Sequence, residues 1–237
     1  MQSRVFHGAL VLAGLLATAP AHAQYSHVQI EMVLGSVDGD VTAQAVQLRI
    51  AQAGDSSLAG MTVVACDSTG GNPVTVCTLP TSVSNGALGA RVLLCSNGML
   101  GRLAPFIAPD FMLSTPIPPS YLSAGTLYID MPGDGMGPLW RLSWGGASYL
   151  GSGAVESIND PDGDCNPPYP NGLFGETGQG VKFLFDPNTQ STTNASDYAL
   201  DLGASQVWNN AGEKATVVSG TTAVAVTSWG AIKRQYR

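Results

Sequence analysis

Short apolar runs, separated by clusters of Gly, Pro, Asn, Asp and Ser, follow one another along the chain. Within many runs the apolar residues alternate with polar ones, which is the period of a β-strand. The pattern predicts about nine strands, at residues 28–34, 45–51, 61–66, 74–79, 90–95, 127–131, 139–144, 180–185 and 198–202. We therefore predict an all-β fold built mainly from antiparallel strands.

Two segments between the predicted strands lack this alternation. Residues 106–121 are rich in proline, which suits an extended connection better than a sheet interior. Residues 159–178 contain several Gly and Pro and are predicted to form a long loop. Long loops in compact domains often carry function, so binding residues are expected there.

One predicted strand carries two tryptophans on the same face. Trp140, Leu142 and Trp144 share a face by period 2, while Arg141 and Ser143 point to the other. The aromatic pair could form a platform for stacking a sugar. We favour a place in the core, because large aromatic side chains supply much of the buried area of a small β-domain.

The first 23 residues have the features of a signal peptide. Arg4 provides the positive start, residues 9–17 are apolar, and Ala21-His22-Ala23 is a small-residue cleavage site. We expect cleavage before Gln24 and a secreted, periplasmic or cell-surface protein. No later stretch reaches the roughly 20 apolar residues of a transmembrane helix, so no membrane span is predicted.

Composition narrows the function. Charged residues make up only 11% of the chain and the net charge is −7, which argues against nucleic acid as a partner. After the leader the only histidine is His27, and no G-x-S-x-G motif occurs. A carboxylate pair of Glu156 or Glu176 with Asp160 could in principle hydrolyse glycosides, but nothing in the sequence fixes the separation. We therefore predict no enzymatic activity.

Four cysteines follow the leader, an even number for an exported chain. Cys66 and Cys77 flank a turn-rich segment between two predicted strands, so we expect a cross-strand disulfide between them. The alternative is a pair of buried thiols. Cys95 and Cys165 would then form the second, long-range disulfide.

The long loop contains acidic residues at alternate positions, Asp160, Asp162 and Asp164. Calcium loops use such spacing because several carboxylates can converge on one cation. The sixth and twelfth positions of a calcium loop of the EF-hand type are, however, Cys165 and Asn171 here. Calcium is thus one interpretation, and a solvated acidic loop is the other. Asp38 and Asp40 are expected to form a turn.

Several short landmarks occur in a fixed order: His27-Val28-Gln29-Ile30-Glu31, a strand at 45–49, the segment 66–70, Pro109-Asp110-Phe111, and 194–198 leading to 209–213. In this respect residues 24–213 resemble exported bacterial proteins of the lamin-tail-domain type. The resemblance implies an immunoglobulin-like β-sandwich that serves in interaction or attachment, without known enzymatic chemistry. The chain departs from the pattern at Gln47, where the family more often has Glu.

Composition changes after Glu213, so residues 214–237 are assigned to a spacer and a basic aromatic tail. Residues 215–226 are uncharged and could form either an edge strand or a spacer. Trp229, Lys233, Arg234 and Arg237 mark the tail. We expect it to attach the protein to an acidic receptor or envelope surface, the alternative being a frayed end.

Together these features favour an exported, non-catalytic module. We expect it to bind an extracellular or envelope protein or a polysaccharide through its loops. A calcium-dependent adhesion or carbohydrate-binding domain is the second interpretation, and a secreted hydrolase is the third.

Overall fold

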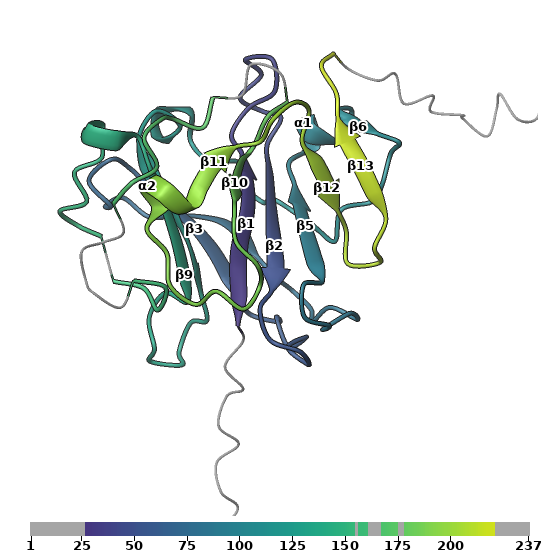
Figure 1. Cartoon of the computed structure of the whole chain (residues 1–237), viewed down its shortest axis with the longest axis horizontal. Coiled ribbons are helices and arrows are strands. Elements are labelled where there is room, and N and C mark those ends of the chain that lie inside the picture. The colour runs from purple at the N-terminus through teal and green to yellow at the C-terminus, as the bar shows by residue number, and fades with distance from the viewer. Residues whose placement is uncertain (1–26, 155, 161–166, 175–177, 221–237) are drawn as a thin grey trace, which may run out of the picture.

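The structure is a computed structural model that describes residues 27–154, 156–160, 167–174 and 178–220 (Figure 1). These residues form thirteen strands and only short helices, which confirms the prediction of an all-β fold. The strands are β1 (Val28–Leu34), β2 (Ala45–Ile50), β3 (Thr62–Cys66), β4 (Val74–Thr78), β5 (Arg91–Cys95), β6 (Leu103–Ala104), β7 (Phe111–Met112), β8 (Gly125–Asp130), β9 (Trp140–Trp144), β10 (Val181–Phe183), β11 (Tyr198–Leu200), β12 (Gln206–Trp208) and β13 (Lys214–Val217). The helices are α1 (Asn97–Leu100) and α2 (Asn194–Asp197), with 3-10 turns at Pro119–Tyr121 and Gly146–Ser148.

The strands form three sheets. A six-stranded sheet has the order β11-β10-β1-β2-β5-β7, a four-stranded sheet the order β4-β3-β8-β9, and a three-stranded sheet the order β12-β13-β6. Among the strands of the described residues, β5 and β7 are the one pair in parallel, and an isolated parallel bridge joins Trp144 to Tyr169. Each of the nine strands predicted from the sequence is present, with ends that agree within two residues.

The six-stranded sheet is covered on both faces. On one face, residues such as Ile30, Leu48 and Val92 pack with Leu127 and Leu142 of the four-stranded sheet in the first core. On the other face, a second core joins residues of β1, β2 and β5 to α1 and the three-stranded sheet: Met32, Leu34, Ala45, Leu93, Cys95, Met99, Leu103, Val207, Ala215 and Val217 are among its members. The two larger sheets therefore form a sandwich, and the third sheet is an addition to it.

A register shift in β1 lets this strand serve both cores. The pairing of β1 with β2 shifts between Ile30 and Met32, so Glu31 is the extra residue of a β-bulge. Ile30 points into the first core and Met32 into the second. The bulge leaves the carboxylate of Glu31 on the face of the second core.

The two tryptophans of β9 are buried, which confirms their assignment to the core. The indole Nε1 of Trp140 donates to the hydroxyl of Tyr198 at 2.8 Å, and that of Trp144 donates to the carbonyl of Tyr121 at 2.9 Å. Buried indole N–H groups need such partners. Neither ring is available for stacking a sugar.

Residues that follow Glu213, predicted to be an edge strand or a spacer, form β13. This strand lies between β12 and β6 at the centre of the three-stranded sheet, and Val217 is completely buried. Ala215 and Val217 alternate with the outward Thr216, so the strand follows period 2 despite its uncharged, low-complexity composition. The change in composition therefore does not mark the end of the fold.

The signal peptide, residues 1–23, and the four tail residues named above lie outside the described residues. Within the described part of the chain, no helix is both long enough and apolar enough to cross a membrane.

Candidate functional site

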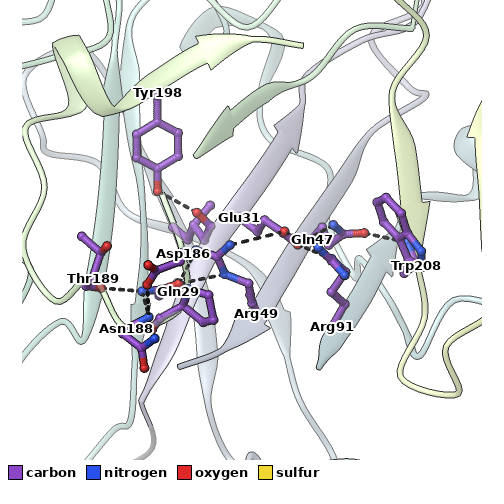
Figure 2. A network of polar contacts seen from close by, with 12 residues as sticks. Gln29, Glu31, Gln47, Arg49, Arg91, Asp186, Asn188, Thr189, Tyr198 and Trp208 are labelled. Atoms are coloured by element: carbon purple, nitrogen blue, oxygen red, sulfur yellow. Dashed lines mark hydrogen bonds and ion pairs between the residues drawn. The ribbon is translucent and has the colours of Figure 1, made fainter. Parts of the chain in front are cut away.

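Part of the outer face of the six-stranded sheet is polar, yet it is buried. Gln29, Glu31, Gln47 and Arg49 are almost inaccessible to solvent, and the side chain of Arg91 is 31% exposed (Figure 2). The alternation along β1 and β2 would normally indicate a solvent-exposed face. Here a loop at residues 186–189 and the strand β12 cover it.

Glu31 is the centre of this polar cluster. Its carboxylate accepts two hydrogen bonds from the guanidinium of Arg91, at 2.8 and 2.9 Å, and one from Nε2 of Gln47 at 2.6 Å. On the other side, Nη1 of Arg49 lies 3.6 Å from Oε1 of Glu31. Such bidentate, charge-assisted bonds fix the orientation of both partners. The bulge at Glu31 is what aims the carboxylate between the two arginines.

Arg49 continues the cluster toward the opposite edge. Its Nε and Nη2 both donate to Oε1 of Gln29, at 2.9 and 2.7 Å. Nε2 of Gln29 in turn donates to the carbonyls of Pro187 and Thr189, at 3.2 and 2.5 Å. Burial lowers the pKa of Arg49, and the nearby charge of Glu31 opposes that shift. The cluster thus ties a distant loop to the central sheet.

On its other side the cluster holds β12 and the turn that follows. Oε1 of Gln47 accepts from the backbone N–H of Trp208 at 2.7 Å, and the guanidinium of Arg91 lies 4.4 Å from the centre of a Trp208 ring. The carbonyl of Arg91 accepts from Nδ2 of Asn210 at 3.1 Å. Oδ1 of Asn210 accepts from the N–H of Asn85 at 2.8 Å. These contacts bring a loop near residue 85 and the turn after β12 together.

A pocket of about 310 Å³ opens where these two loops meet the start of β7. Its volume is at the lower end of the range for small-molecule sites, roughly 300–1,000 Å³. The residues around it come from three separate parts of the chain: Thr81, Ser82, Val83, Ser84, Asp110, Phe111, Asn210 and Ala211.

Among the described residues that line the pocket, Asp110 provides the only carboxylate. Its Oδ2 accepts from the N–H of Leu93 at 2.7 Å, and both oxygens accept from the N–H of Asn210, at 2.8 and 3.0 Å. Burial raises the pKa of Asp110, although these N–H groups act in the opposite direction. Within the described ranges no basic side chain forms an ion pair with Asp110. The carboxylate is therefore fixed in position with unused acceptor capacity.

The other groups at the pocket are hydroxyls and a phenyl ring. Thr81, Ser82 and Ser84 are exposed, and each hydroxyl can donate and accept. Phe111 is half-buried and packs with one side against the first core. A carboxylate, several hydroxyls and an apolar ring suit a ligand that has hydroxyl groups on its edge and C–H groups on its face.

Of the three predicted calcium ligands, only Asp160 lies in the described residues. Asp160 is buried, and its Oδ2 accepts from Nη2 of Arg141 at 2.5 Å. Asp162 and Asp164 lie outside the described residues. Where the chain is described, no group of three His, Cys, Asp or Glu side chains is placed to hold a metal. Asp160 therefore serves as the counter-ion of a buried arginine on β9.

The structure contradicts the predicted disulfide between Cys66 and Cys77, which are both buried free thiols. Their strands are adjacent, as expected, but Cys77 pairs with Val63 and Cys66 pairs with Thr126 on the other side of β3. A register offset of three residues corresponds to about 10 Å along a strand, beyond the reach of a disulfide of about 7 Å. Cys77 also points into the first core, which Cys66 does not.

The second predicted disulfide has only one described partner. Cys95 is a free thiol, completely buried in the second core, and Cys165 lies outside the described residues. Burial raises the pKa of Cys95 to about 12. Such a thiol packs as a small apolar side chain.

Asp38 and Asp40 form the predicted turn. Residues Val37 and Asp40 form an isolated bridge, Asp38 has a φ of 51°, and Oδ1 of Asp40 accepts from the N–H of Thr42 at 2.9 Å. Arg102 pairs with Asp38 at 2.9 Å.

His27 lies beside Asp55, with Nδ1 of His27 3.3 Å from Oδ2 of Asp55, and neither residue lines the Asp110 pocket.

Sequence reasoning did not identify the pocket. Pro109-Asp110-Phe111 and Asn209-Asn210 stood out only as landmarks, because nothing local shows that residues 100 positions apart bind one another. The available signal was an acidic and an aromatic residue side by side in a proline-rich connection.

No protein-family model, curated protein or solved structure matches the chain.

Proposed function

We propose that the protein is an exported, non-catalytic module that binds a neutral glycan in the Asp110 pocket. The observation that carries the proposal is the environment of the Asp110 carboxylate. It is half-buried, has no ion pair in the described chain and is held by two backbone N–H groups. Hydroxyl groups of a sugar can donate short, charge-assisted hydrogen bonds to such a carboxylate.

The surroundings of Asp110 support a sugar over a peptide. Three exposed hydroxyl side chains provide further polar partners, and the ring of Phe111 offers an apolar surface for the C–H face of a pyranose. The negative charge of Asp110, on a chain with a net charge of −7, disfavours anionic glycans. Neutral glycans are therefore the expected ligands.

The contacts of Asn210 support a preformed site. Its side chain bonds to Asn85 and Arg91, while its backbone N–H bonds to Asp110. Little loop ordering is then needed on binding, so the entropic cost of binding is lower than for a mobile loop.

The test is a screen of the purified protein against immobilised neutral and anionic glycans. We expect binding to one or more neutral glycans, and a loss of at least tenfold in affinity for Asp110→Asn, which removes the charge. Ser82→Trp should block the pocket from its exposed wall without altering the buried bonds. Glu156→Gln, which removes an exposed carboxylate outside the pocket lining, is the matched control. Binding that both pocket variants retain would overturn the proposal.

A further inference from the structure

Among the described strands, β11 is an edge strand of the six-stranded sheet, and an apolar groove lies along this edge. The edge strand β11 pairs with β10 on one side, and together the strands line a groove of about 460 Å³. Leu184, Leu200 and Leu202 lie exposed along it, and Leu202 is 97% accessible. Exposed apolar strands at a sheet edge are normally covered or blocked, because they pair readily with another extended segment. This groove therefore needs an occupant.

The described chain ends close to the groove. The N–H of Val217 in β13 donates to the carbonyl of Ser205, whose hydroxyl accepts from the N–H of Gly180, and the carbonyl of Gly180 accepts from Asp201. Asp201 is itself part of the groove. In Figure 1 the end of β13 and the connection from β11 to β12 lie at the upper end of the molecule, whereas β1 begins at the lower end. The C-terminal residues are thus better placed than the N-terminal ones to reach the groove.

The sequence after Gly220 suits an added strand. Residues 221–227 read Thr-Thr-Ala-Val-Ala-Val-Thr, which are small or β-branched and uncharged. At about 3.3 Å per extended residue, residues 221–237 are long enough to run along the short strand β11. Lys233, Arg234 and Arg237 also complement Asp201, the acidic residue of the groove lining, which contains one basic residue, Lys182.

We infer that the C-terminal segment, residues 221–237, docks on the groove of its own chain. Residues 221–227 pair with the free edge of β11 and cover Leu184, Leu200 and Leu202. Recognition by strand addition combines main-chain hydrogen bonds with side-chain contacts on alternate residues. Because the segment is tethered a few residues from the groove, its effective concentration is high, on the order of millimolar.

Hydrogen exchange of the full chain, followed by mass spectrometry, tests this inference. We expect the amides of residues 221–227 to exchange at least tenfold more slowly than in a free peptide of residues 221–237. Leu202→Glu should return them to the rate of the free peptide. Leu150→Glu, at another exposed leucine outside the groove, is the control and should leave the protection unchanged.

Three results would overturn the inference. The first is exchange of the wild-type segment at the rate of the free peptide. The second is protection that survives Leu202→Glu. The third is protection that depends on protein concentration, since this would indicate pairing with a second copy. None of these results bears on the glycan screen, so the two proposals fail separately.

Discussion

The guanidinium of Arg91 lies 4.4 Å from the centre of a Trp208 ring, so a partly exposed charge of the central sheet directly supports the strand that leads to the Asp110 pocket. The same guanidinium donates twice to Glu31, and the carbonyl of Arg91 holds the side chain of Asn210. The geometry of the pocket thus depends on a cluster that does not touch the proposed ligand.

The first prediction concerns Arg91. Substitution by Lys keeps the positive charge but loses the bidentate pairing and the flat surface over Trp208. We expect the free energy of unfolding to fall by about 1–3 kcal/mol, measured by urea denaturation. Glycan affinity should fall as well, since the turn at Asn210 is held less firmly. An unchanged denaturation midpoint would show that the pairing contributes nothing to the fold.

The second prediction concerns Glu31, whose side chain is only 2% exposed. Glu31→Gln leaves Arg49 and Arg91 without their carboxylate, and loss of one member of a buried ion pair typically costs about 3–5 kcal/mol. We expect a larger loss of stability than for Arg91→Lys. Equal midpoints for the wild type and Glu31→Gln would contradict this account of the cluster.

The third prediction concerns the cysteines. Burial raises the pKa of Cys66 and of Cys77 to about 11, and the thiolate is the reactive form. Both should therefore react slowly with iodoacetamide in the native protein and rapidly after denaturation without reductant. Mass spectrometry of the peptides would show the alkylation. A peptide pair linked through Cys66 and Cys77 would contradict the observed register.

The fourth prediction concerns Asp160, which neutralises the buried Arg141. Asp160→Asn should lower the free energy of unfolding by about 3–5 kcal/mol, because a buried ion pair with Arg141 is broken. Glu156→Gln, an exposed carboxylate in the same loop, is the control and should change stability little. Thermal melts with and without calcium complete the test. Full recovery of Asp160→Asn by added calcium would favour a cation site instead.

The sequence predicted the strands well, but it did not predict how they are covered. The missed strands β6, β7 and β12 have two or three residues each, too short for a clear period, and β13 was only one of two alternatives for its segment. The alternation at Gln29 and Glu31 resembles an exposed face, and only contacts with residues 186–189 and Trp208 bury it. Such long-range cover leaves no local pattern.

The disulfide prediction failed for a related physical reason. A turn-rich segment between Cys66 and Cys77 correctly indicated a hairpin, but the register depends on which face of each strand enters the core. A register shift between Val63 and Val64 increases the offset between Cys66 and Cys77 along the paired strands. The Asp110 pocket likewise depends on contacts between distant segments.

The fifth prediction concerns pH. Because burial raises the pKa of Asp110 above its unfolded value, the folded state binds this proton more tightly. Protonation of Asp110 therefore stabilises the folded state at a pH below the unfolded pKa. This stabilisation is lost as the pH rises through the pKa of Asp110 in the folded state. Glycan binding should show the opposite trend, since it requires the carboxylate. Affinity measured from neutral to acidic pH should therefore fall at a pH above the usual range of an aspartate. An affinity independent of pH over that range would exclude Asp110 as the acceptor.

The most direct test of the central claim is an NMR titration of the isotope-labelled protein with neutral gluco-oligosaccharides and chito-oligosaccharides. If a sugar binds at Asp110, the largest amide shifts will occur at Leu93 and Asn210, whose N–H groups donate to that carboxylate. The same titration with an oligouronate should leave these amides unchanged. Shifts confined to other surfaces, or none with any neutral sugar in the series, would contradict the account.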